Sequence, residues 1–252
     1  MPVIYSSSSG TSNDGQLINI GQSSWANARD ATSSSHINTT YTSSSSFTQV
    51  HKFSGRGGGN SYGVYRSFIV FDTSGITSTV ASATLSIYGV SQNDGSIIAV
   101  KSNAFGGDGG TTLAKADFNA IVGWSAGSSL AGSATTYGSN VFKPPSDTWS
   151  TSGYNDFTAT SDLLTDMQND NVVIICFMNY TNDYLNSELT VNAFLDTGGY
   201  YANYTGTSRD PKIDYTLAAT GYGDTVNAVA PANIAGVNGV ATANIEKVIG
   251  VD

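Results

Sequence analysis

The stretch that decides the fold is residues 172–178, Val172-Val-Ile-Ile-Cys-Phe-Met178. All seven side chains are apolar, so a strand formed here is apolar on both faces and must be covered on both faces. We therefore predict that this run is the central strand of a β-sheet protein. Cys176, the single cysteine of the chain, lies inside the run, which excludes a disulfide framework and indicates a buried structural thiol.

Two further core strands are predicted upstream, where apolar and polar residues alternate. The alternation covers residues 65–72 and, more regularly, residues 81–88. Residues 97–101 follow as the predicted hairpin partner of residues 81–88, across the turn sequence Asn93-Asp94-Gly95.

The remaining chain adds short strands, polar loops and little helix. Strands are predicted at residues 16–20, 47–53, 189–194 and 211–217, and short helices at residues 112–122 and 161–169. Tracts of serine and glycine separate these elements and read as loops. The fold class that this pattern predicts is all-β: an antiparallel β-sandwich, as a jelly roll, with one or two short helices and an extended C-terminal repeat tail.

The C-terminal segment repeats with a period of 11 residues. Ala232-Asn-Ile-Ala-Gly-Val-Asn-Gly-Val-Ala-Thr242 is followed by a second copy from Ala243, and a degenerate copy precedes both. We predict a jelly-roll body at residues 1–218 and a docking tail at residues 219–252. The tail contains too little apolar surface to fold alone, so it is expected to become ordered against a partner. The predicted partner-docking residues are Val226, Val229, Ile234, Val237, Val240, Ile245, Val248 and Val251.

Composition restricts the partners and the compartment. Only 12% of the residues are charged and the net charge is −9, with ten scattered lysines and arginines, which argues against nucleic acid as a partner. No run approaches the roughly 20 apolar residues of a membrane span, and no signal peptide is expected from the opening residues 1–5. A phage virion reconciles synthesis in the host cytoplasm with a surface rich in serine, threonine and tyrosine.

A family resemblance supports this interpretation. Arg66-Ser-Phe-Ile-Val-Phe-Asp-Thr-Ser-Gly-Ile76, a short spacer and then Ala81-Ser-Ala-Thr-Leu-Ser-Ile-Tyr88 resemble the opening of the DNRLRE-type jelly-roll domains. These domains look like carbohydrate-binding modules and recur in secreted surface proteins and phage structural proteins. The resemblance covers residues 14–217 and implies the jelly-roll fold. It implies no site, and no catalytic residue carries over from it.

Candidate chemistry is sparse, so no catalytic residue and no metal ligand is assigned. Gly123-Trp-Ser-Ala-Gly127 matches the nucleophile elbow of hydrolases, but His36 and His51 both precede it, whereas a triad of that kind needs a later histidine. Calcium is the one cofactor left open. Its oxygen ligands would come from the pairs Asn13-Asp14, Asn93-Asp94 and Asn182-Asp183, which turn formation explains equally well.

Three tyrosines, Tyr200, Tyr201 and Tyr204, form a cluster in a glycine-rich loop. Exposed rings on a polar loop suit stacking against a glycan or a protein interface. The alternative is that the loop packs onto the edge of the sandwich.

The function expected from these observations is that of a non-enzymatic phage virion structural protein, in a capsid decoration or a fibre. Its jelly-roll domain would be displayed and its C-terminal tail would anchor it. The expected partners are other virion proteins, copies of itself and a host-surface glycan, with no nucleic acid and no membrane. Two alternatives stay open: a carbohydrate-binding adhesin module, and a polysaccharide-degrading enzyme that uses aspartates.

Overall fold

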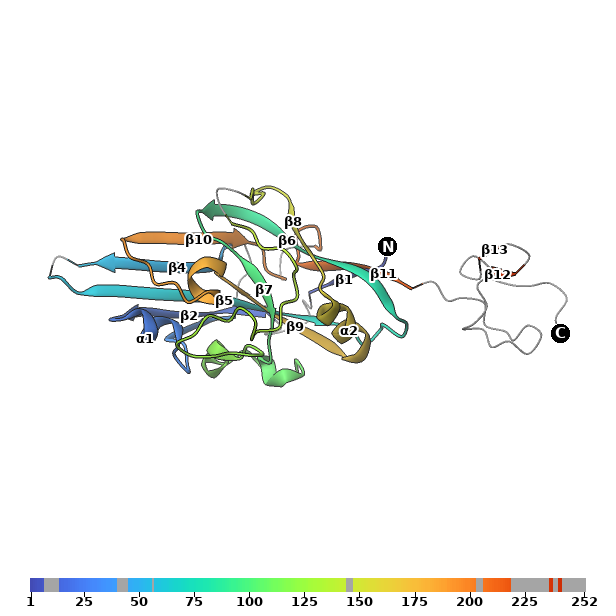
Figure 1. Ribbon diagram of the computed structural model, residues 1–252, viewed down its shortest axis with the longest axis horizontal. Coiled ribbons are helices and arrows are strands. Elements are labelled where there is room, and N and C mark those ends of the chain that lie inside the picture. Colours follow the sequence, from blue (N-terminus) through green and yellow to red (C-terminus); the bar gives the residue numbers. More distant parts are fainter. Residues whose placement is uncertain are drawn as a thin grey trace. The chain divides into compact units, whose positions relative to one another are not determined.

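A computed structural model describes residues 1–6, 14–39, 45–55, 57–143, 147–202 and 206–218, together with the backbone of residues 236–237 and 240–241. The chain divides into two units, Met1–Thr216 and Leu217–Asp252. The first unit is an antiparallel β-sandwich with short helices, which confirms the all-β class (Figure 1). Its strands are β1 (Val3–Tyr5), β2 (Asp14–Gln22), β3 (His36–Asn38), β4 (Ser45–Ser54), β5 (Asn60–Asp72), β6 (Val80–Asn93), β7 (Ile98–Lys101), β8 (Tyr154–Thr158), β9 (Val172–Met178), β10 (Ala193–Gly199) and β11 (Lys212–Leu217).

Two long strands organise this sandwich. Strand β5 is 13 residues long. Its first half pairs with β4 and its second half with β9, while β2 pairs along its other edge. Strand β6, of 14 residues, pairs with β8 and then with β10. Strands β10, β4, β5 and β2 therefore lie side by side at one end of the unit (Figure 1).

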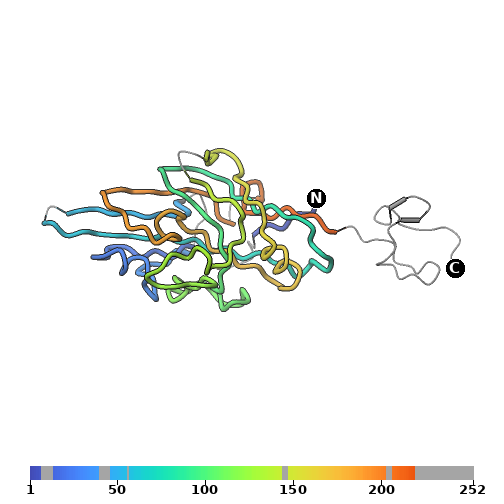
Figure 2. Tube along the Cα trace, viewed as in Figure 1, coloured from blue at the N-terminus to red at the C-terminus, as the bar shows by residue number. Residues whose placement is uncertain are grey.

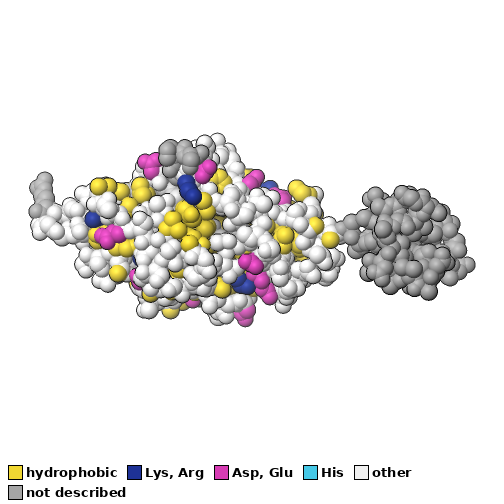
Figure 3. All heavy atoms as spheres, in the orientation of Figure 1, with side chains coloured by type: hydrophobic (Ala, Val, Ile, Leu, Met, Phe, Trp, Pro, Cys, Tyr) yellow, Lys and Arg dark blue, Asp and Glu magenta, His cyan; other side chains and the backbone are white. Residues whose placement is uncertain are grey.

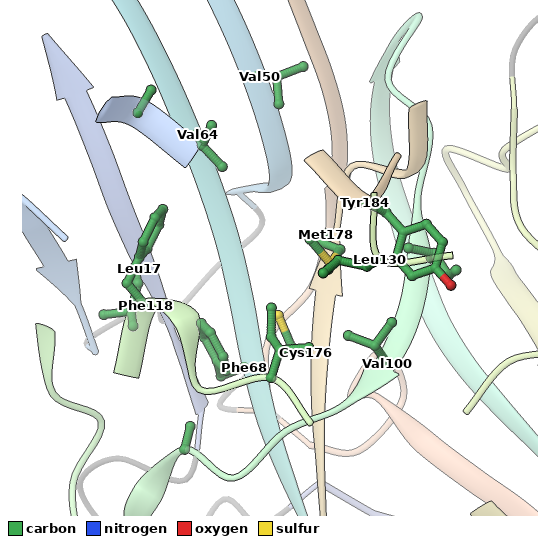
Figure 4. Packing of buried hydrophobic residues seen from close by; sticks show 14 of the residues in the cluster. Leu17, Val50, Val64, Phe68, Val100, Phe118, Leu130, Cys176, Met178 and Tyr184 are labelled. Carbon is green, nitrogen blue, oxygen red and sulfur yellow. The ribbon is translucent and has the colours of Figure 1, made fainter. Parts of the chain in front are cut away.

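Strand β9 separates two hydrophobic cores. Ile174, Cys176 and Met178 enter the first core, and the intervening residues of β9 enter the second. Figure 4 shows Cys176 and Met178 among the side chains of the first core. The prediction that residues 172–178 form a strand covered on both faces is confirmed.

Each core has its own cover. Helix α1 (Trp25–Arg29) and the 3₁₀ turns η1 (Phe105–Gly107) and η2 (Lys115–Asn119) contribute buried residues to the first core. The second core lies under β6, β8 and helix α2 (Ser161–Asn169). Helix α2 was predicted at the same residues, and its N-cap, Thr160, accepts a hydrogen bond from the backbone N–H of Leu163.

Three predicted elements differ from the structure. Strand β7 pairs with β9 and not with β6, so the predicted hairpin is wrong. The reason is burial: alternate residues of β7 enter both cores, and only a position beside β9 covers both faces. The predicted helix at residues 112–122 is reduced to η2, because the carbonyl oxygens of Lys115 and Ala120 accept hydrogen bonds from distant chain segments. The strand predicted at residues 189–194 begins only at Ala193.

In the second unit, the described backbone consists of β12 (Gly236–Val237) and β13 (Val240–Ala241), paired antiparallel. Val237 lies opposite Val240, so the chain reverses here and does not continue as one extended strand. The sequence between the strands is Asn238-Gly239, the favoured pair for a tight hairpin turn. The other predicted docking residues, Val226, Val229, Ile234, Ile245, Val248 and Val251, lie outside the described residues.

Candidate binding pocket beside helix α1

A buried ion pair joins β5 to the π-helical turn η3 (Tyr180–Tyr184) beneath the first core. Arg66 and Asp183 are both fully buried. The guanidinium of Arg66 donates to both carboxylate oxygens of Asp183, from Nε at 2.8 Å and from Nη2 at 2.7 Å. It also donates to the carbonyl oxygens of Phe118 and Arg29. This bidentate pairing and the two additional hydrogen bonds compensate for the desolvation of two buried charges.

Helix α1 is tied to the same ion pair through Arg29. The Nε of Arg29 donates to the backbone carbonyl of Asp183 at 2.7 Å, and its Nη2 donates to the carbonyl of Ser128 at 2.8 Å. Its Nη1 donates to the carboxylate of Asp30, which is part-exposed. Burial lowers the pKa of Arg29, although the neighbouring carboxylate of Asp183 opposes that shift. The arrangement fixes where Asp30 meets the surface.

A pocket of about 380 Å³ opens beside α1. Four chain segments that are distant in sequence supply its walls, and side-chain oxygens and nitrogens are frequent among the lining groups. The lining residues are Ser23, Ser24, Trp25, Ala26, Asp30, Tyr62, Gly127, Asn186 and Glu188.

The polar side chains of this pocket are held by neighbours. Trp25 Nε1 donates to Asn186 Oδ1 at 2.9 Å, and the hydroxyl of Tyr62 donates to Glu188 Oε1 at 2.5 Å. The backbone N–H of Gly127 donates to Asp30 Oδ2 at 3.0 Å. Asn186 has a φ of 53°, in the left-handed region that non-glycine residues adopt at a cost in free energy. These contacts fix the pocket before any ligand arrives.

A second hollow, of about 500 Å³, lies along the other side of α1. It shares Ala26 and Asp30 with the first pocket, and its other lining residues are mostly polar: Gln22, Asn27, Ala31, Thr32 and Ser33. The surface around α1 therefore presents hydroxyl, amide and carboxylate groups over two adjacent depressions.

Two of the three tyrosines of the predicted cluster are described, and neither is fully exposed. Tyr201 is 1% exposed, its ring lies 4.7 Å from that of Phe47, and its hydroxyl is hydrogen-bonded to Ser67. Tyr201 is therefore part of the packing, and the prediction that it contacts a glycan or partner is wrong. Tyr200 is half-buried, packs edge-on against Tyr88 and accepts a hydrogen bond from Arg209. Tyr204 lies outside the described residues.

The hydrolase-like motif lies in turns. Gly123 and Gly127 both have positive φ, at 83° and 71°, and the described segment 102–143 supplies neither the preceding strand nor the following helix that a nucleophile elbow requires. The structure therefore assigns no nucleophile to Ser125.

Two of the three predicted calcium-ligand pairs contain an aspartate that is engaged elsewhere, while Asn93 and Asp94 are exposed at the end of β6 and Asn13 lies outside the described residues. The carboxylate of Asp183 is bound by Arg66, and Asp14 Oδ2 accepts the backbone N–H of Ala202, so neither is presented to a cation in a surface loop. Within the described residues, no three His, Cys, Asp or Glu side chains are grouped so as to hold a metal ion. Cys176 is fully buried, and burial raises the pKa of its thiol, as expected for a structural cysteine.

Sequence reasoning missed an exposed aromatic face on β4 and β10. Phe53 and Phe194 are 47% and 41% exposed and flank His51. The imidazole of His51 lies on Gly63, where a Cβ atom would come within 2.2 Å of the ring, so the neighbouring strand needs a glycine at this position. Burial lowers the pKa of His51 and favours its neutral form. We call Phe53, Phe194 and His51 the aromatic face.

The aromatic face and the pocket lie on opposite sides of β4 and β5. Lys52 and Tyr62 are directly opposed in the ladder, as are His51 and Gly63, and successive residues of a strand point to opposite faces. Tyr62 lines the pocket, so His51 points to the other side.

Within the described residues, no helix is long and apolar enough to cross a membrane. No protein-family model and no curated protein matches the chain.

Proposed function

We propose that the protein is a non-enzymatic structural protein of a phage virion, a capsid decoration protein or a fibre component. Its jelly-roll body is displayed, and residues 219–252 anchor it to other virion proteins or to copies of itself. The observation that carries the proposal is the 11-residue repeat, in which an apolar-x-Gly/Ala-apolar pattern recurs three times. Small residues between apolar ones let a backbone approach a partner closely while the larger side chains enter pockets.

The body supports an anchoring role for the tail because its described residues already build two cores. Among the residues that the structure describes, the members of both cores lie between Ile4 and Tyr215, and we propose that these cores pack without residues 219–252. Charged side chains are sparse on the face in Figure 3, in line with the 12% content of the sequence. A surface of this kind suits a protein that is packed at high copy number in a particle.

The test is incorporation into particles. Cells infected with the parent phage would express tagged full-length protein, a variant ending at residue 218, or the double variant Val237→Asp with Val248→Asp. We expect only the full-length protein to co-purify with particles, while the purified variants melt at close to the full-length temperature because their cores are intact. Absence of the full-length protein from particles would contradict the virion role. Incorporation of either variant would assign attachment to the body.

A carbohydrate-binding adhesin module is the second candidate, and the pocket beside α1 is the observation that favours it. Asp30 and Glu188 both line this pocket. A polysaccharide-degrading enzyme would also use a pair of carboxylates, so the same pocket provides a test of the enzymatic alternative. Release of reducing ends from a polysaccharide, abolished by Glu188→Gln, would contradict the non-enzymatic proposal.

A further inference from the structure

We infer that the pocket lined by Trp25, Tyr62, Asn186, Glu188 and Asp30 binds a neutral saccharide through adjacent hydroxyl groups. The inference goes beyond the virion role and names the ligand class and the site of the second candidate function. It concerns a different surface from the tyrosine loop, in which Tyr201 is buried.

The first argument is the hydrogen-bonding capacity that remains in the pocket. Asn186 Oδ1 is taken by Trp25, which leaves the two N–H donors of its amide group, and among the described residues no partner is found for them. Glu188 Oε1 is taken by Tyr62, and the Glu188 side chain is 51% exposed. A donor amide therefore stands in one pocket with carboxylate acceptors. A sugar hydroxyl donates and accepts at once, and two neighbouring hydroxyls match such a set.

The second argument is charge, which selects a neutral ligand. Each carboxylate of the pocket has one basic neighbour, so the pocket offers no unpaired positive group to a phosphate, a sulfate or an acidic sugar and no unpaired carboxylate to a free cation. Arg29 binds Asp30, and Lys52 Nζ lies 4.0 Å from Glu188 Oε1. The ligand that fits these groups is therefore a neutral molecule that donates hydrogen bonds to carboxylate oxygens.

The third argument is rigidity. Asn186 follows η3 closely in sequence, and Asp183 of that turn is held by the buried pair with Arg66. Arg29 ties helix α1, and with it Trp25 and Asp30, to the same turn. A pocket whose groups are fixed beforehand loses less conformational entropy on binding, which is what a small polar ligand requires.

The size agrees with this ligand class. A volume of about 380 Å³ lies within the range of roughly 300–1,000 Å³ of small-molecule sites, and the hollow of about 500 Å³ across Ala26 and Asp30 gives a longer chain room to continue. The pocket would accept one or two sugar residues of a longer glycan.

The experiment uses the purified full-length protein on an array of bacterial oligosaccharides that includes neutral, N-acetylated, amino and uronic acid sugars. The best ligand is then titrated by calorimetry against four variants. Glu188→Gln keeps the shape and the acceptor for Tyr62 but removes the charge. Asn186→Gly removes the amide, and glycine tolerates the φ of 53°. The controls are Asp162→Asn, an exposed carboxylate on α2, and Phe194→Ser on the aromatic face.

We expect binding to neutral or N-acetylated glycans and none to uronic acid glycans. Each pocket variant should weaken binding about tenfold or more, as expected for loss of a hydrogen bond to a charged or fixed group, while both controls bind normally and all four variants keep the wild-type melting temperature. Three results would overturn the inference: no glycan bound, binding unchanged in both pocket variants, or binding lost only in Phe194→Ser, which would place the site on the aromatic face. None of these results bears on incorporation into particles.

Discussion

Replacing Asp14 by asparagine will stabilise the protein at neutral pH and remove part of its pH dependence. Asp14 is the first residue of β2 and is 6% exposed. Its Oδ2 accepts the backbone N–H of Ala202 at 2.9 Å. Burial, partly offset by this hydrogen bond, raises the pKa of Asp14 to about 6 from its ordinary 3.8. An asparagine oxygen can accept the same hydrogen bond without placing a charge in the core.

The sign of the effect follows from proton binding. A carboxyl group with a raised folded-state pKa binds more protons in the folded state than in the unfolded state between pH 3.8 and about 6. Its contribution to stability is fully present below the lower pKa and is lost as pH rises through the upper one. A difference of about two pKa units, at about 1.4 kcal/mol per unit, corresponds to about 3 kcal/mol lost by pH 7. Asp14→Asn does not ionise, so it avoids this loss.

Urea unfolding of the wild type and of Asp14→Asn from pH 4 to pH 8 measures this difference directly. We expect the difference in the free energy of unfolding between the variant and the wild type to increase by up to about 3 kcal/mol from acidic to neutral pH, in favour of the variant. Asp72→Asn is the control with the opposite sign. Hydrogen bonds from Ser74 lower the pKa of the exposed Asp72 below its ordinary 3.8, so this variant should be slightly less stable than the wild type by a constant amount from pH 4 to pH 8. The difference should vanish only in more acidic titrations, as pH falls through the lowered pKa. A constant gap between the wild type and Asp14→Asn from pH 4 to pH 8 would refute the reasoning.

Two further predictions concern the buried centre of the sandwich. Ile175→Asp should cost several kcal/mol in the free energy of unfolding, because it places an unpaired charge in the second core; Ile175→Val should cost only about 1 kcal/mol, and near-wild-type chemical denaturation of the aspartate variant would show that this face is not covered. Asp183→Asn should cost about 3–5 kcal/mol, because it leaves the guanidinium of Arg66 buried without its counter-charge. The control is the part-exposed pair of Lys212 and Asp214, whose side chains are each 22% exposed. Asp214→Asn should cost at most about 1 kcal/mol, and an equal effect of the two variants in denaturant titrations would contradict the importance assigned to full burial.

Where the sequence pattern was strong, it predicted the structure. Residues 172–178 are apolar on both faces, and the observed β9 separates two cores. Residues 161–169 combine helical spacing with a serine at the start that was predicted as the cap, and α2 has the same bounds, although the N-cap in the structure is Thr160. Both signals are local. The pairing of β7 was predicted from a turn sequence alone and was wrong, because strand partners depend on which faces need cover, and that is decided by elements far away along the chain.

The buried ion pair shows what alternation can and cannot reveal. Arg66 lies two residues before Phe68, so the alternation already places it on the face that enters the first core. A charged residue at an inward position predicts a buried partner. The partner, Asp183, lies 117 residues further on, in a segment that looked like a calcium loop or a turn. No spacing in a single sequence distinguishes it from the other aspartates.

The pocket could not be predicted from the sequence either, although the same ion pair holds it in place. None of its polar residues forms a motif, and Trp25, Tyr62 and Glu188 come from separate segments that meet only in the folded protein. A buried ion pair adds little net stability over a well-packed apolar cluster, because desolvation offsets most of its Coulomb attraction. What Arg66 and Asp183 supply is position: their hydrogen bonds have one geometry, whereas apolar side chains repack. Arg29 binds both the backbone of Asp183 and the carboxylate of Asp30, and Asn186 follows the turn that contains Asp183. The buried ion pair therefore fixes the positions of the polar groups at the surface of the pocket, at the free-energy cost of burying two charges.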